Sequence, residues 1–253
     1  MHEQSSFVLS EVEGRRRRRP SNSLRANVLL LGCALLAGCR AQSEPASFPP
    51  AGRDVAPIVS DAFSTEDVRD RVGEFEAVVA AAEVKPGMSV ADIGAGEGYY
   101  TVRLSPLVGI RGRVLAQDIV PEVRDRLAER VQREKLDNVA VRLGEPSDPS
   151  LPPSSLDRIF LVHMYHEVTD PYAFLWHLIG GLRQGGEVVV VDADRPVKRH
   201  GIPPARLKCE LAALGLSLQR FERLPGGDSY FAAFRIAAPR PAPAAIKPCA
   251  MPE

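Results

Sequence analysis

Three glycines at alternate positions, Gly94, Gly96 and Gly98, follow a short apolar run that contains Asp92. Glycines after a first strand let a ligand approach the backbone closely at the N-terminus of the next helix. The GxGxG spacing differs from the GxGxxG of dinucleotide sites, and the carboxylate just before it would repel a pyrophosphate. The same carboxylate accommodates the ammonium group of an amino acid. The pattern therefore favours a ligand with an amino-acid moiety over a dinucleotide.

A second acidic residue, Asp118, ends the next predicted strand, about 20 residues further along. An acidic side chain at this position can accept hydrogen bonds from both hydroxyls of a ribose. Together, the two carboxylates and the glycines indicate a nucleoside ligand with an ammonium group. A nicotinamide-binding oxidoreductase is the less favoured alternative, because Asp92 opposes it.

A third group of chemically capable side chains follows the predicted strand 158–162: His163, Tyr165, His166 and Glu167. His166 or Glu167 could act as a general base, and Tyr165 could orient a substrate. No distal ligand is evident that would complete a metal site with these residues, so we predict none. His200 begins a loop that we expect to be a simple connector rather than a cover for a pocket.

Purely structural roles remain open for several of these residues. Gly98 can serve a tight turn, Asp92 can cap the following helix, and His166 can be a loop histidine without catalytic duty. Cys209 lies on a predicted helix, where a buried, small apolar role is favoured.

The elements that must position these residues alternate between strand and helix, which predicts a parallel sheet covered by helices on both faces. Five strands are expected at 90–93, 113–119, 138–144, 158–162 and 187–193, with helices at 67–84, 100–107, from 121, at 171–182 and at 203–214. Two further strands, 216–224 and 229–236, are joined by only four residues. Such a short link permits an antiparallel hairpin and excludes a helical crossover.

The composition is that of an ordinary globular domain, with 253 residues, 45% hydrophobic residues and a formal net charge of zero. This balance gives no reason to expect a nucleic-acid partner. The folded domain is predicted over 57–237, and a tail rich in proline and alanine, 238–253, is predicted to be disordered.

The N-terminus has the layout of an export signal. A basic run at 15–19 precedes an apolar segment at 26–38, which is shorter than the ~20 residues of a membrane-spanning helix. Leu36-Ala37-Gly38-Cys39 resembles the bacterial lipobox, whose cysteine is lipidated and becomes the first mature residue. We therefore predict a signal peptide at 1–39, a flexible tether at 40–56 and a lipid anchor at Cys39 facing the periplasm. If the signal is not used, the protein is cytoplasmic.

The stretches VADIGAGEGYYTVRL and GGLRQGGEVVVVDADRP, together with Asp118, resemble the class I S-adenosylmethionine-dependent methyltransferases over about residues 84–235. DRIFLVHMYHEVTDPYAFL is similar to bacterial lipoprotein-type proteins with a methyltransferase domain. The resemblance implies a Rossmann-like, doubly wound, seven-stranded α/β sheet, mostly parallel with an antiparallel C-terminal hairpin.

The resemblance also implies a role for each residue toward S-adenosylmethionine. Gly94 and Gly96 would pass close to the methionine moiety, with Asp92 near its ammonium group and Gly98 in the same loop. Asp118 would hold the ribose, and Glu145 would contact the adenine, although the family more often has aspartate there. His163, Tyr165 and His166 would line the mouth of the active site.

Two functional hypotheses follow. One is a methyltransferase with an unknown small-molecule, lipid or protein acceptor; the other is a non-catalytic envelope lipoprotein that kept the fold. They differ because S-adenosylmethionine is made in the cytosol, whereas a lipidated, exported protein lies outside it.

Overall fold

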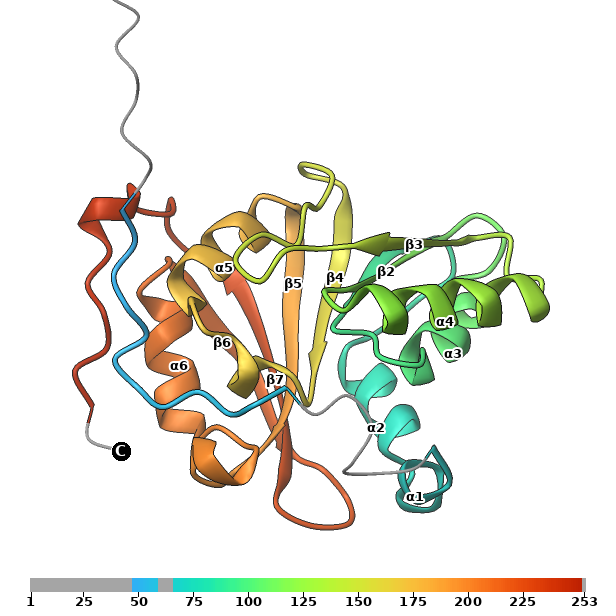
Figure 1. Cartoon of the computed structure of the whole chain (residues 1–253), viewed down its shortest axis with the longest axis horizontal. Helices are drawn as coiled ribbons and strands as arrows, with labels where there is room; N and C mark the ends of the chain where they lie inside the picture. Colours follow the sequence, from blue (N-terminus) through green and yellow to red (C-terminus); the bar gives the residue numbers. More distant parts are fainter. Residues whose placement is uncertain (1–46, 59–65, 252–253) are drawn as a thin grey trace, which may run out of the picture. The chain divides into compact units, whose positions relative to one another are not determined.

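The computed structural model describes residues 47–58 and 66–251, which include a seven-stranded sheet in the order β3-β2-β1-β4-β5-β7-β6 (Figure 1). The strands are β1 (Ser89–Ile93), β2 (Arg113–Asp118), β3 (Val139–Leu143), β4 (Leu156–Val162), β5 (Leu182–Ala193), β6 (Leu216–Arg223) and β7 (Ser229–Ile236). Strands β1 to β5 pair in parallel, and β7 is antiparallel to both β5 and β6. The predicted fold and its antiparallel hairpin are confirmed.

The strand order reverses direction at β1. The chain moves outward from β1 to β2 and β3, then returns to place β4 on the other side of β1. In open parallel sheets, such a switch point leaves a crevice beyond the carboxyl ends of the two central strands. The glycines after β1 and the histidines after β4 therefore meet at one edge of the sheet.

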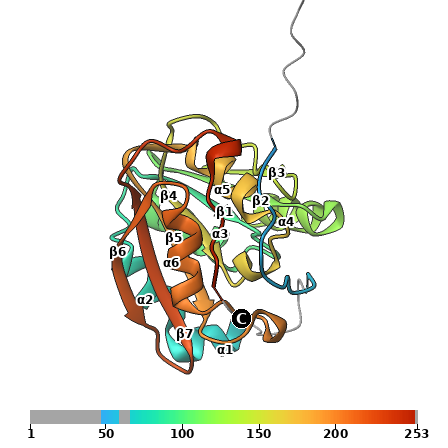
Figure 2. The ribbon, with the colours of Figure 1, turned by 90° about the vertical axis from the view of Figure 1, so that its left-hand side faces the viewer.

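The helices lie on both faces of the sheet (Figures 1 and 2). One face packs against α2 (Glu74–Ala81), α3 (Tyr99–Val108) and α4 (Pro121–Arg133), and the other packs against α5 (Pro171–Ile179) and α6 (Pro204–Ala212). Alternate residues of each strand point to opposite faces, so a central strand covered on both is apolar throughout. The run of four valines at 188–191 in β5, all fully buried, follows from this position.

Two elements differ from the sequence-based expectation. The helix expected over 67–84 is divided into α1 (Glu66–Val72) and α2, because Gly73 adopts φ 67° in the left-handed region. The helix expected to continue to Leu182 ends at Ile179. Strand β5 begins at Leu182 and includes Gly185 and Gly186. Tertiary pairing of Leu182 with Leu156 extends β5 backward beyond the valine run.

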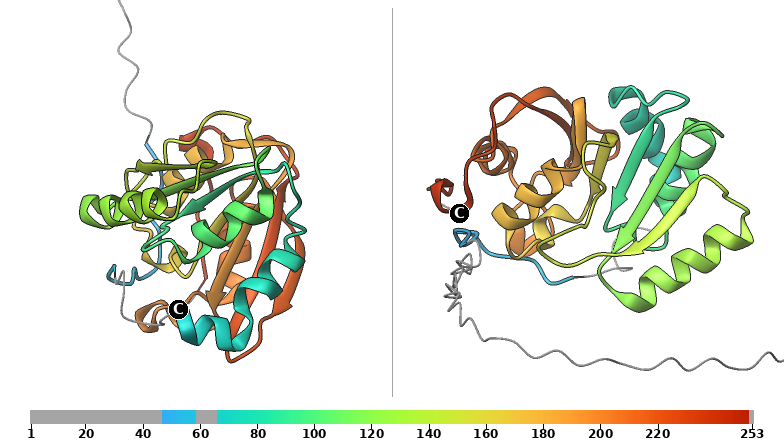
Figure 3. Two further views of the ribbon diagram at one scale, coloured as in Figure 1. Left: turned by 90° about the vertical axis from the view of Figure 1, so that its right-hand side faces the viewer. Right: turned by 90° about the horizontal axis from the view of Figure 1, so that it is seen from above.

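The segments on either side of the predicted domain are packed onto it, contrary to expectation. Arg53, within the predicted tether, is buried and forms an ion pair with Glu210 of α6 (Nε–Oε1 2.9 Å). The predicted disordered tail is held by a disulfide between Cys209 and Cys249 and by burial of Ile246. The two segments run side by side in Figure 3, with the Cys249 carbonyl next to Gly52.

Cys209 is therefore a disulfide partner and not the free, buried thiol that we expected. The predicted signal peptide, the lipobox and residues 40–46 of the predicted tether lie outside the described residues. Within the described ranges, no helix has both the length and the apolarity to cross a membrane.

Candidate functional site

A cavity of about 710 Å³ lies at the carboxyl ends of the central strands. Its walls come from the loops after β1, β2, β3, β4 and β5 and from the N-terminal helices α1 and α2. This volume is in the range of sites for small molecules and cofactors. Of the predicted site residues, the cavity is lined by Gly94, Gly96, Asp118, Glu145, His163, His166 and Glu167.

The glycine loop forms one wall of the cavity and requires glycine for two different reasons. Gly94 has φ 65°, and a Cβ there would lie 3.0 Å from Cγ of Met164, which also lines the cavity. Gly98 instead caps the N-terminus of α3 with φ 89°, and a Cβ there would meet Leu127 at 2.4 Å. Gly98 therefore serves helix packing, and the structure does not place it on the cavity wall as a ligand contact.

Asp118 ends β2 beside this loop. Its Oδ2 accepts a hydrogen bond from the Gly96 amide (3.0 Å), and its Oδ1 accepts one from the Val120 amide (2.9 Å). These bonds fix the carboxylate at the cavity wall, where a ribose diol would need an acceptor. Glu145 also lines the cavity, and it is exposed.

Asp92 lies behind the glycine loop, and only 3% of its surface is exposed. Its Oδ2 accepts a hydrogen bond from the Thr101 hydroxyl (2.6 Å). Burial, only partly offset by this hydrogen bond, raises the pKa of Asp92 to about 6. The structure thus holds a carboxyl group that can change protonation state next to the loop.

His163 follows β4 and is tied to the N-terminal helices. Its Nε2 lies 2.9 Å from Oε2 of Glu74, whose other oxygen accepts hydrogen bonds from Arg69 and Tyr100. Burial alone would raise the pKa of Glu74, but the hydrogen bond and charge of His163, together with Arg69, lower it to about 2. The ionised Glu74 therefore holds α2 against the end of β4, next to the cavity.

Tyr165 is not at the active-site mouth, and its predicted role in orienting a substrate is wrong. The side chain is fully buried, and its hydroxyl donates a hydrogen bond to Oε2 of Glu210 (2.8 Å). The Arg53 guanidinium forms an ion pair with the other oxygen of Glu210. Successive side chains of the 3-10 turn Tyr165–Glu167 point in different directions, so Tyr165 enters the core while His166 lines the cavity.

His166 is the predicted catalytic residue with the most developed environment. It is 3% exposed, and its Nδ1 lies 3.0 Å from both carboxylate oxygens of the fully buried Asp192 at the end of β5. The Ala193 amide donates to the same carboxylate. A carboxylate bonded to Nδ1 fixes the proton on that nitrogen and leaves the Nε2 lone pair available.

Two further side chains approach the Nε2 side of His166. Oε1 of Glu167 lies 4.0 Å from Nε2, and the ring centroids of His166 and His200 are 5.6 Å apart. His200 lines the cavity, so the loop that it begins is more than a connector. His200 is therefore a distal residue near this pair that the sequence does not reveal, and one ligand atom from each of His166, Glu167 and His200 lies within 4.8 Å of the others.

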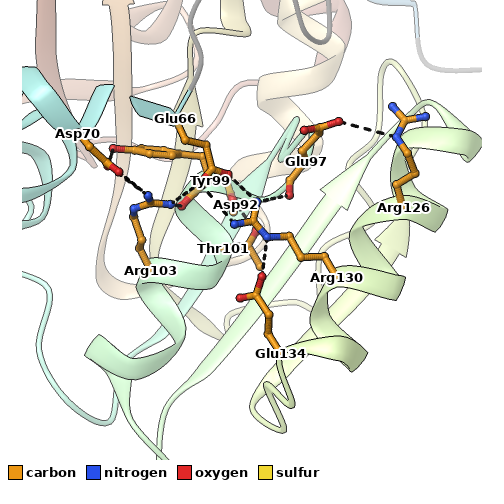
Figure 4. A network of polar contacts seen from close by, with 10 residues as sticks. All are labelled: Glu66, Asp70, Asp92, Glu97, Tyr99, Thr101, Arg103, Arg126, Arg130 and Glu134. Atoms are coloured by element: carbon orange, nitrogen blue, oxygen red, sulfur yellow. Dashed lines mark hydrogen bonds and ion pairs between the residues drawn. The ribbon is translucent and has the colours of Figure 1, made fainter. Parts of the chain in front are cut away.

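A polar network attaches α1 to α3 and α4 beside the cavity (Figure 4). Glu66 of α1 accepts hydrogen bonds from Arg130 (2.5 Å) and Arg103 (3.2 Å). The bond from Arg130 is the largest cause of the lowered pKa of Glu66. Asp70 accepts hydrogen bonds from both Tyr99 and Arg103. Because α1 contributes Glu66 and Arg69 to the cavity wall, these contacts hold that wall in place.

Sequence reasoning missed Glu74, Met164 and Asp192. Asp192 offered a signal, since it is an acidic residue at the end of a buried strand parallel to the one that precedes His166. The other two had none, because their roles depend on how α2 and the turn after β4 fold onto the glycine loop.

Comparison with known proteins agrees with this architecture. Residues 91–190 match a family model described as a methyltransferase domain. A protein-L-isoaspartate O-methyltransferase from Ignicoccus hospitalis is 29% identical over 119 residues, covering 47% of this chain and 54% of that protein. A ubiquinone/menaquinone biosynthesis C-methyltransferase from Shewanella frigidimarina is 29% identical over 120 residues, covering 47% of each. The chain thus spans about half the length of these curated relatives.

Among solved structures, an S-adenosylmethionine-dependent methyltransferase from Aquifex aeolicus superposes with a TM-score of 0.61 and 27% identity, covering 67% of this chain and 93% of that one. The family-model match over residues 91–190 includes the glycine loop, Asp118 and His166, and it ends two residues before Asp192.

Proposed function

We propose that this chain, which contains a class I S-adenosylmethionine-dependent methyltransferase domain, transfers the methyl group of that cofactor to a nucleophilic acceptor. The observation that carries the proposal is a single cavity with two chemically different ends. The glycine loop and Asp118 line one end, and His166, bonded to the buried Asp192 behind it, lines the other. The proposal rests on this site and not on the relatives' own substrates.

The residues at the first end fit the cofactor. Gly94 and Gly96 present backbone without side chains at the wall, and Asp118 offers a fixed carboxylate for the ribose. Glu145, which also lines the cavity, would contact the adenine. Asp92 would compensate the ammonium group from behind the loop. When bound, S-adenosylmethionine supplies an activated methyl group that carries its own leaving group.

The residues at the second end of the cavity would contact the methyl acceptor. Methyl transfer from a sulfonium needs mainly placement and exclusion of water, and a base is required only if the acceptor must lose a proton. His166 can take that proton at Nε2, because Asp192 holds Nδ1–H and stabilises the imidazolium that forms. Since the cavity must hold both molecules, its volume favours a small acceptor or a protruding group of a larger one.

The test of cofactor binding is calorimetric titration of the purified protein with S-adenosylmethionine. Asp118→Ala should weaken binding by about 1–3 kcal/mol, the cost of removing a charged hydrogen-bond acceptor. The matched control is Asp137→Ala, since Asp137 is an exposed carboxylate away from the cavity. Equal affinity in the Asp118 variant, or no binding by the wild type at millimolar cofactor, contradicts the assignment.

We also propose that the protein is a lipoprotein of the bacterial envelope, anchored through Cys39 and facing the periplasm. The disulfide between Cys209 and Cys249 supports this location, because disulfides persist in oxidising compartments and are rare in the cytosol. Radiolabelled palmitate should be incorporated into the wild type and not into Cys39→Ser. Equal incorporation of palmitate into Cys39→Ser and the wild type would contradict a lipid anchor at Cys39.

A further inference from the structure

The cluster His166, Glu167 and His200 at the acceptor end of the cavity carries a further inference. Each residue offers one ligand atom, and the three atoms lie within 4.8 Å of one another. Two of the residues are consecutive in the turn after β4, and the third follows β5 in the loop before α6. The fold therefore brings together donors from two segments that are separate in sequence.

The distances suit a shared ion better than a hydrogen bond. The 4.0 Å between Nε2 of His166 and Oε1 of Glu167 exceeds the usual hydrogen-bond range of ~2.7–3.2 Å. Two donors bound tetrahedrally to one zinc ion at ~2.1 Å lie about 3.4 Å apart. The His166–Glu167 distance therefore exceeds this zinc-bound separation by only about 0.6 Å.

The surroundings of His166 are those of a metal ligand. A histidine that binds zinc usually donates its other ring N–H to a carboxylate, which fixes the tautomer and strengthens the ligand. Asp192 accepts this bond at Nδ1 with both oxygens at 3.0 Å, and it is fully buried. His200 is held with φ 53° in the left-handed region, a conformation that costs a non-glycine residue energy and is enriched at functional sites.

We propose that His166, Glu167 and His200 bind a divalent transition-metal ion, for which zinc is the best match. Two imidazoles and one carboxylate are a known zinc ligand set that leaves a fourth position open. That position faces the same cavity as the glycine loop. The inference rests on the proposed function for its role, which is to hold the acceptor's oxygen and favour loss of its proton to solvent. With the metal bound, Nε2 of His166 is coordinated and the proton goes to solvent; in the metal-free protein, Nε2 is the base.

The experiment titrates ZnCl₂ by calorimetry into metal-free, unlipidated protein that carries Cys33→Ser and Cys39→Ser, so that no free thiol competes for the ion. One ion per chain is expected, with affinity reduced at least tenfold in both His166→Ala and His200→Ala. Asp192→Asn should reduce it by about 10–100-fold, as is usual for a residue that orients a metal-bound histidine. Substituting Co²⁺ should give the visible absorption of a four-coordinate site in the wild type and not in His200→Ala.

The matched control is His177→Ala, because Nδ1 of His177 is bonded to the Ser147 carbonyl outside the cavity. Thermal melting without metal shows whether each variant is folded. No binding by the wild type, or equal loss in the His177 variant, overturns the metal site. Titrating S-adenosylmethionine into the same samples separates the two proposals: cofactor binding without zinc binding refutes only the metal, and the reverse refutes only the methyltransferase.

Discussion

Ionisation of Asp92 lowers the stability of the free protein but would favour binding of an ammonium group. It belongs to the central strand β1, so its carboxyl group is buried behind the glycine loop with Thr101 as hydrogen-bond donor. Burial raises its pKa to about 6, from an ordinary value of 3.8. An ionised group in this position is costly in the free protein, but it is what a bound ammonium group requires.

The sign of the pH effect follows from linkage. Because the folded-state pKa is raised, this group contributes stability that is complete below pH ~4 and is lost as the pH rises through about 6. Asp92→Asn keeps an acceptor for Thr101 and removes the ionisation. We expect the variant to be more stable than the wild type at pH 7, by about 1–3 kcal/mol, and equally stable near pH 4.

Urea unfolding at both pH values measures this difference, and the same variant should bind S-adenosylmethionine more weakly at pH 7. A variant that is less stable at pH 7 would show that the ionised carboxylate is already compensated in the free protein.

At the residue scale, a role could be predicted from the sequence only where it depends on neighbouring residues along the chain. Gly94, Gly96 and Asp118 were predictable because strand ends and turn spacing place them directly on the cavity wall. Tyr165 and His166 were not distinguishable from sequence, since a one-residue difference in a turn decides which side chain enters the core. His200 reaches the site only through the path of the loop after β5.

At the scale of elements, alternation and connection length predicted the parallel sheet and its antiparallel hairpin, but not the strand order. They failed where tertiary contacts override local pattern. The left-handed Gly73 divides the first helix, and pairing with β4 draws Leu182 into β5. The segments before and after the domain are rich in proline and alanine, and they were predicted to be a flexible tether and a disordered tail. A buried ion pair and a disulfide instead attach them to α6.

The disulfide gives an element-scale prediction. Cys209 and Cys249 close a loop with a sequence separation of 40, and such a bridge restricts the unfolded chain. Reducing it, or replacing both cysteines by serine, should lower the free energy of unfolding by about 2–4 kcal/mol. Urea unfolding with and without reductant measures this loss. The double-serine variant is the control, because reductant should not affect it further. An identical transition for the oxidised and reduced wild type contradicts the prediction.

At the scale of the whole molecule, two parts of the chain point to different compartments. The domain is similar to S-adenosylmethionine-dependent methyltransferases, whose cofactor is made in the cytosol. The predicted lipobox and the disulfide instead favour the envelope. The proposed cofactor site could be predicted from the sequence, because the glycine loop and Asp118 are local features of the first two strands. The acceptor is not encoded in any such local pattern, since its end of the cavity is assembled from the turn after β4 and the loop after β5.

The central claim is that this cavity transfers a methyl group and does not merely retain the fold. Its most direct test incubates the purified protein with S-adenosylmethionine and an extract of the producing cells that contains small molecules, lipids and proteins, and measures S-adenosylhomocysteine by mass spectrometry. The wild type should form several equivalents per chain, and Asp118→Ala and His166→Ala should form far less. A wild-type protein that binds the cofactor by calorimetry but forms no more product than a heat-inactivated sample would contradict the claim.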